Sequence, residues 1–175
     1  MKILKFGGTS VGSAENIKKI GEIVLSQQEK IIVVVSALGG VTDMLLGAAR
    51  DAASGIRVNG ELTAIRVRHE EVIAKLFNLQ NGVQTFDSLR PLFDELEKII
   101  QGVSLIGELT PKTLDKILGF GERLSSLLIS RFLNVPLLDS MALIKTDKNF
   151  GKANVDFELT YKLILEASYN FLQTR

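Results

Sequence analysis

The sequence contains no cysteine and no tryptophan, and it has a single histidine among its 175 residues. The absence of cysteine excludes disulfide bonds, thiolate metal sites and a cysteine nucleophile. The one histidine, His69, falls on the apolar side of a predicted helix. A lone histidine in that position is usually a core residue with its hydrogen bonds made, so we assign it no role in chemistry.

The chain also lacks an excess of charge of either sign. Lys and Arg total 21 against 20 for Asp and Glu, which gives a net charge of +1, and no basic tract stands out. This balance argues against a nucleic-acid-binding surface of the usual electrostatic kind. The composition, 46% hydrophobic and 23% charged, is that of an ordinary globular protein, and the length fits one domain.

Long hydrophobic runs are missing as well. The longest apolar stretches, IIVVV and LLIS, are far too short to span a bilayer. The N-terminal apolar run is broken by Lys5 and then by glycines, so it does not have the pattern of a signal peptide. We therefore expect a cytoplasmic protein with no membrane partner.

Two short apolar runs predict a pair of parallel strands joined by a helix. Residues 3–6 and 31–35 are rich in β-branched side chains and are followed by turn residues. The second run has no polar alternation, so we expect it to be buried on both faces of a sheet. The segment SAENIKKIGEIVLSQQEK, residues 13–30, has helical apolar spacing, with Ser13 as the N-cap. Together they predict a right-handed βαβ unit.

After the second strand the pattern is mostly helical. Thr110 is placed to cap a helix whose first position is Pro111. The expected fold class is α/β and layered, with helices inserted between the second and third strands. The apolar spacing predicts helices at residues 44–53, 62–76, 89–100, 111–133 and 155–173, a strand at 135–140, and a further strand or hairpin near 142–147.

The loop after the first predicted strand carries groups suited to phosphate. It reads KFGGTS and contains Lys5, Gly7, Gly8, Thr9 and Ser10. Glycines let backbone N–H groups approach an anion closely, the next helix adds its dipole, and the lysine adds a mobile positive charge. The glycine spacing fits neither the Walker A motif nor the dinucleotide fingerprint. The residues alone leave two interpretations open, a phosphate-binding loop and a glycine turn with a solvated lysine.

A second glycine pair follows the second predicted strand. The segment SALGGVTD places Gly39 and Gly40 beside Ser36, Thr42 and Asp43. Ligands of open α/β sheets bind beyond the carboxyl ends of the strands, so two such loops on neighbouring strands would form one pocket. The alternative is a simple turn in which Thr42 caps the next helix, and Thr42 could do both.

The segment GFGERLSS is unusual for the interior of a helix. Gly119 and Gly121 each cost about 1 kcal/mol relative to alanine, so we expect another part of the chain to approach closely there. Glu122 lies on or beside the apolar stripe and needs a partner, either Arg123 or Lys116 or a bound ammonium group. Taken alone, the pattern favours a structural ion pair. The charge-rich segments RVRHEE and DELEK are expected to be solvated helix faces.

Four segments together resemble the N-terminal part of an aspartate kinase. They are KFGGTSVG, VVVSALGGVTD, GFGERLSS and TDKNFGKANVD, and the resemblance runs from residue 2 to about residue 159. KFGGTS is specific, because other amino-acid kinases share the fold but carry different first loops. GERLSS favours the branch that is often fused to a homoserine dehydrogenase. The resemblance implies an amino-acid-kinase-like α/β fold, a three-layer αβα sandwich with a largely parallel sheet, of which residues 1–175 would be the N-terminal part.

The resemblance implies an activity as well as a fold. It implies ATP-dependent phosphorylation of the side-chain carboxylate of L-aspartate to 4-phospho-L-aspartate, an early step toward lysine and threonine, with ATP bound as its magnesium complex. Carried over by position, Lys5 would be the catalytic residue and would stabilise the γ-phosphoryl group, and no residue is assigned to a metal. The residues implied to bind phosphate are Lys5, Gly7, Gly8, Thr9 and Ser10, and those implied to bind aspartate are Ser36, Ala37, Thr42 and Glu122, with Glu122 pairing the ammonium group.

Members of the family carry further segments that are not recognisable here. Nothing in residues 1–175 resembles the nucleotide-binding half or the regulatory ACT domains. We therefore expect an aspartate-binding part with an incomplete nucleotide and magnesium site, and weak or absent turnover by this chain alone. The alternatives are an inert anion-binding domain, and a module whose uncovered apolar faces drive homo-oligomerisation.

Overall fold

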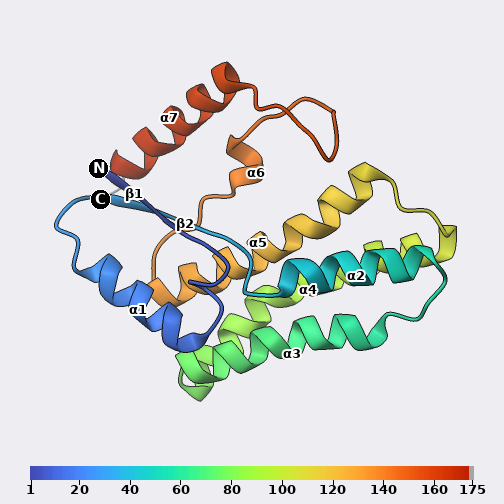
Figure 1. Cartoon of the computed structure of the whole chain (residues 1–175). Helices are drawn as coiled ribbons and strands as arrows, with labels where there is room; N and C mark the ends of the chain where they lie inside the picture. The colour runs from blue at the N-terminus through green and yellow to red at the C-terminus, as the bar shows by residue number, and fades with distance from the viewer. Residues whose placement is uncertain (174–175) are drawn as a thin grey trace. The chain divides into compact units, whose positions relative to one another are not determined.

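The computed structural model describes residues 1–173. They fall into two compact units, the first made by Met1–Leu137 and the second beginning at Leu138. The first unit contains both strands and helices α1 to α5, and the second contains helices α6 and α7 (Figure 1). None of the helices in the described part of the chain is both long enough and apolar enough to cross a membrane.

The chain opens with the predicted βαβ unit. Strand β1 (Lys2–Phe6) and strand β2 (Ile31–Val35) pair in parallel, with Lys5 opposite Val34, and helix α1 (Ala14–Leu25) connects them. Ser13 is the N-cap, as predicted, because its side chain accepts the N–H of Asn16 at 3.2 Å. The predicted order of strand, helix and strand and the parallel pairing are confirmed, although the helix ends at Leu25 and not near residue 30.

The two faces of the small sheet differ in burial. Phe6 and Val35 pack against the core on one face, whereas Ile3 is 67% exposed and Val34 is 44% exposed on the other. The prediction that the second strand is buried on both faces is wrong. Within the described residues the sheet has two strands, and the core lies against one of its faces only, so an apolar run without alternation does not imply two covered faces.

Four helices complete the first unit and confirm the predicted helical region. Helix α2 begins earlier than predicted, because Gly40 is its N-cap with a φ of 82°. Thr42 therefore lies inside the first turn and does not cap the helix, which corrects that alternative. Thr110 caps α5 as predicted, accepting the N–H of Thr113 at 3.1 Å. The bounds are α2 (Val41–Ala53), α3 (Asn59–Leu76), α4 (Leu79–Ile106) and α5 (Pro111–Leu133).

His69 is part of the core of the first unit. It is fully buried, its Nδ1–H donates to the carbonyl of Ile65 at 2.8 Å, and its ring meets Phe93 edge-on with 5.5 Å between centroids. Its Nε2 has no hydrogen-bond partner among the described residues. The predicted core position is confirmed, but the expectation that all its hydrogen bonds are made is wrong. A buried polar atom without a partner reduces stability.

We expect this histidine to make the protein less stable in mild acid. Burial lowers the pKa of His69, and this outweighs the Ile65 carbonyl, which raises it. The unfolded chain takes up a proton near pH 6.5, at the ordinary pKa, whereas the folded chain takes it up only at lower pH. The free energy of unfolding is therefore unaffected by the protonation of His69 above about pH 6.5. Below that pH it decreases, as the pH approaches the pKa of His69 in the folded state.

Urea unfolding of the wild type and of His69→Phe at about pH 7.5 and about pH 5.5 measures this loss. The wild type should lose more stability between the two values than the variant, because phenylalanine has no proton to gain. An equal loss in the two proteins would show that other groups cause the acid sensitivity.

From residue 135 onward the chain has more helix and less strand than predicted. Residues 135–140 form no strand, because Pro136 has no N–H for a sheet ladder and Asp139 accepts the N–H of Met141 at 3.0 Å to cap α6 (Ser140–Leu143). The hairpin expected near residues 142–147 is reduced to one antiparallel bridge between Thr146 and Val155. Helix α7 (Phe157–Gln173) confirms the last predicted helix.

Candidate functional site

The two glycine loops meet beyond the carboxyl ends of β1 and β2. The N–H of Ser36 donates to the carbonyl of Phe6 at 3.1 Å, which extends the strand pairing into the loops. A Cβ atom added to Gly8 would lie 3.4 Å from the carbonyl oxygen of Ala37, and one added to Gly39 would lie 3.4 Å from that of Gly8. The loops therefore pack backbone against backbone, as the sequence predicts for one shared site.

The first loop presents free backbone donors next to a lysine. Its fold is set by the N–H of Val11, which donates to the carbonyl of Gly7 at 3.1 Å. Within residues 1–173, the N–H groups of Gly8, Thr9 and Ser10 donate to no other part of the chain. The Nζ atom of Lys5 lies 3.6 Å from where a Cβ on Gly7 would be, so the cation sits at the loop. Such a set of N–H groups beside a positive charge can hold an anion.

An arginine from a distant helix supports the first loop. Arg68 on α3 donates to the carbonyl of Gly12 at 2.6 Å. The prediction that RVRHEE is only a solvated face is therefore wrong for Arg68, and sequence reasoning missed its role. A signal was present, because Arg68 lies three residues after Ile65 and four before Val72, which are both buried.

Helix α5 holds the second loop from its other side. The hydroxyl of Ser125 donates to the carbonyl of Ser36 at 2.6 Å. A Cβ atom added to Gly121 would lie 2.7 Å from the Cβ of Ala37, which is the close approach that the sequence predicts. The same prediction is wrong for Gly119, where an added Cβ would meet nothing within 4 Å.

Glu122 faces the second loop without a cationic partner. Its Oε1 accepts the N–H of Ala37 at 3.3 Å, and its side chain is exposed. Lys116 and Arg123, the partners considered from the sequence, instead pair with Glu95 at 3.0 Å and 3.3 Å. Glu95 belongs to the segment DELEK and keeps 39% of its side chain exposed, in line with the predicted solvated face. Its pKa is lowered by the hydrogen bond from Lys116 and by the charge of Arg123.

The carboxylate of Glu122 is consequently available to a ligand. In the described part of the chain no lysine or arginine forms an ion pair with it, so the structural ion pair that the sequence favoured is not observed. Thr42 is exposed in the first turn of α2, which starts from the same loop. Among residues 1–173, no group of three or more His, Asp or Glu side chains could hold a metal ion, so we assign no metal ligand.

The chain is similar in sequence to a family of known proteins. The sequence profile of the amino acid kinase family matches residues 1–170. Aspartokinase 1, chloroplastic, of Arabidopsis thaliana is 34% identical over 137 residues, which is 75% of this chain and 23% of that protein. Aspartokinase of Chlamydia trachomatis serovar D is 36% identical over 163 residues, which is 90% of this chain and 34% of that protein.

The fold is similar to that of a solved kinase. The crystal structure of Escherichia coli aspartokinase III in complex with aspartate and ADP superposes with a TM-score of 0.86 at 24% identity. The match covers 99% of this chain and 39% of that one. The chain thus spans only about a quarter to a third of the length of the aspartokinases it matches in sequence.

Proposed function

Since this chain belongs to the amino acid kinase family, we propose that it serves the ATP-dependent phosphorylation of the side-chain carboxylate of L-aspartate. Residues 1–175 would form the aspartate-binding part of that kinase, with the cytoplasm as the proposed compartment on composition alone. The observation that carries the proposal is the meeting of two glycine loops between Lys5 on one side and the unpaired Glu122 on the other.

The first loop would bind the phosphoryl group in transfer. Lys5 neutralises charge that builds on the γ-phosphoryl oxygens, and the free N–H groups of Gly8, Thr9 and Ser10 donate to them. The attacking aspartate carboxylate is ionised at neutral pH, so the reaction needs no general base. This agrees with the burial of His69, the one histidine, in the core.

The second loop and α5 would bind aspartate. Glu122 pairs the ammonium group, and the N–H of Ala37 fixes the orientation of the Glu122 carboxylate rather than contacting substrate itself. Ser36 precedes Ala37 in the second loop and Thr42 is exposed in the first turn of α2, so their hydroxyls would donate further hydrogen bonds to aspartate. The loops thereby align the two anionic reactants, which is the main task in phosphoryl transfer between them.

The proposal is tested by calorimetric titration of L-aspartate and of ATP into the 175-residue chain, with aspartyl hydroxamate formation as the readout of turnover. We propose that aspartate binds, that ATP binds weakly through its phosphates at the first loop, and that turnover is low, because the chain spans about a quarter to a third of the aspartokinase sequences it matches. Absence of aspartate binding to the folded chain would reject the proposal and favour an inert domain.

Replacing Glu122 with glutamine should weaken aspartate binding by about 10-fold, because the ammonium group loses a charged hydrogen-bond acceptor. ATP binding should be unchanged. The matched control is Glu22→Gln, which removes a carboxylate from an exposed position on α1 and should leave both affinities unchanged. A drop in ATP affinity with unchanged aspartate affinity would show that Glu122 contacts ATP and does not bind aspartate.

A second candidate function is association with another copy of the chain. The exposed side chains of Ile3 and Val34 on the uncovered sheet face favour it. Light scattering across a range of protein concentrations tests this candidate. The apparent mass of the wild type should rise with concentration, whereas that of Val34→Lys should stay at the value of a monomer.

A further inference from the structure

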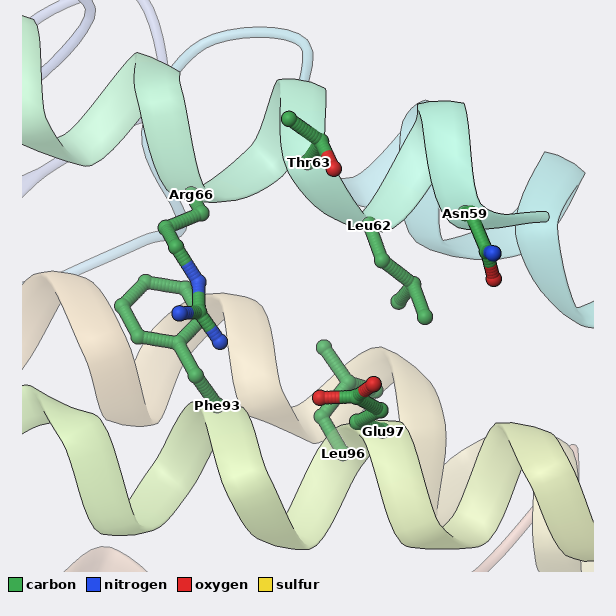
Figure 2. Close-up of a pocket in the computed structure, with 7 residues that line it drawn as sticks. All are labelled: Asn59, Leu62, Thr63, Arg66, Phe93, Leu96 and Glu97. Carbon is green, nitrogen blue, oxygen red and sulfur yellow. The ribbon is translucent and has the colours of Figure 1, made fainter.

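A hollow between α3 and α4 lies apart from the glycine loops. Its volume is about 350 Å³, near the lower end of the range for small-molecule pockets. Figure 2 shows its seven lining residues, and none of them belongs to the predicted site. The lining consists of Asn59, Leu62, Thr63, Arg66, Phe93, Leu96 and Glu97.

Arg66 supplies a positive charge that is held in place but not neutralised. Its guanidinium carbon lies 5.4 Å from the centroid of the Phe93 ring, which fixes the side chain against α4. In the described part of the chain, no carboxylate forms an ion pair with this guanidinium. Because an arginine fork matches a carboxylate in geometry, the unused donors favour a ligand carboxylate.

Glu97 supplies the opposite charge on the facing helix. Figure 2 shows its carboxylate at the hollow, near the Arg66–Phe93 stack. It accepts a long hydrogen bond of 3.4 Å from Gln101, and within residues 1–173 no lysine or arginine forms an ion pair with it. Two opposite charges therefore line the same hollow without pairing with each other.

An apolar surface lies beside these charges. Leu62 extends from α3 toward α4 in Figure 2, and Leu96 below it is 1% exposed. Leu62, which is only partly buried, can cover an aliphatic group, with Leu96 buried beneath it, while the charges at the hollow hold polar groups of both signs. A ligand that matches the hollow thus has a carboxylate, an ammonium group and a short aliphatic chain.

We propose that this hollow binds the zwitterion of a small aliphatic amino acid. Arg66 binds the carboxylate, Glu97 binds the ammonium group, and Leu62 contacts the side chain. The proposal goes beyond the kinase function and does not depend on it. It adds a ligand site between two helices that carry none of the residues assigned to aspartate or phosphate.

Calorimetric titration of L-leucine into the full chain tests the proposal. L-leucine should bind, whereas isopentylamine and 4-methylpentanoate, which each keep one of its two charged groups, should bind at least about 10-fold more weakly. Equal affinity for 4-methylpentanoate or the amine would show that one charge suffices and would overturn the proposal. No binding of L-leucine at millimolar concentration would also overturn it.

Two variants locate the site. Arg66→Gln and Glu97→Gln should each weaken L-leucine binding by about 10-fold or more. The matched control Glu70→Gln, at an exposed position of α3, should bind as the wild type does. Glu97→Gln removes no aromatic stacking, so it remains informative if Arg66→Gln unfolds. Lys5→Ala should bind L-leucine normally, so failure of the kinase site and failure of this site are distinguishable.

Discussion

Replacing Lys5 with alanine is expected to weaken ATP binding by about 10- to 100-fold, the loss that follows from removing one charged hydrogen bond. Where turnover is measurable, it should fall by about 10²- to 10³-fold, because the lysine acts most strongly on charge that develops during transfer. The Nζ atom of Lys5 lies at the first glycine loop, beside three backbone N–H groups with no other partner among the described residues. Titration of ATP and the hydroxamate assay measure the two effects.

Lys2→Ala is the matched control for this prediction. Lys2 lies on the same strand, carries the same charge and pairs with Glu29 at 3.0 Å, at the opposite end of β1 from the loop. Its replacement should leave ATP affinity unchanged. If both variants bind ATP equally well, the lysine at the loop does not contact phosphate, and the glycine turn with a solvated lysine would be the better interpretation.

Gly121→Ala is expected to destabilise the protein by about 1–3 kcal/mol, the usual cost of overpacking a well-packed core. The added methyl group would lie 2.7 Å from the Cβ of Ala37 and 3.5 Å from Leu45, so α5 and the second loop would have to move apart. The shift would also strain the hydrogen bond from Ser125 to Ser36. Urea unfolding at neutral pH measures the change in the free energy of unfolding.

Gly119→Ala, in the same helix, is expected to stabilise the protein and not to destabilise it. Nothing lies within 4 Å of an added Cβ there, so the variant should gain up to about 1 kcal/mol from the higher helix propensity of alanine. Loss of stability in both variants would mean that crowding by Ala37 is not what requires glycine at position 121.

Local signals in the sequence predicted most of the first unit. The apolar spacing of β1, α1 and β2 and the caps at Ser13 and Thr110 are read within a few neighbouring residues, and the structure confirms them. The strand expected at residues 135–140 is wrong, because an apolar run next to a proline does not show whether a neighbouring strand exists to pair with it.

Some features of the candidate site could likewise be predicted from the sequence, and others could not. The glycine loops could be recognised from their composition and from the order of the strands before them. The partners of Glu95 and Arg68 could not, because each contact joins helices or loops whose relative position depends on the whole core. Glu122 is the clearest case. It has no ion-pair partner among the described residues, because Lys116 and Arg123 pair with Glu95 on α4 instead.

The contacts that hold the two loops also set when the site can form during folding. Arg68 and Gly12 are 56 positions apart, and Ser125 and Ser36 are 89 positions apart. Bringing together residues so far apart in sequence costs more chain entropy than forming a local helix, so contacts of this kind form late. A nascent chain can therefore complete α1 to α4, with Arg68 of α3 already available to the first glycine loop, while the second loop is still unsupported. The site takes its full shape only after α5 has been synthesised and packed.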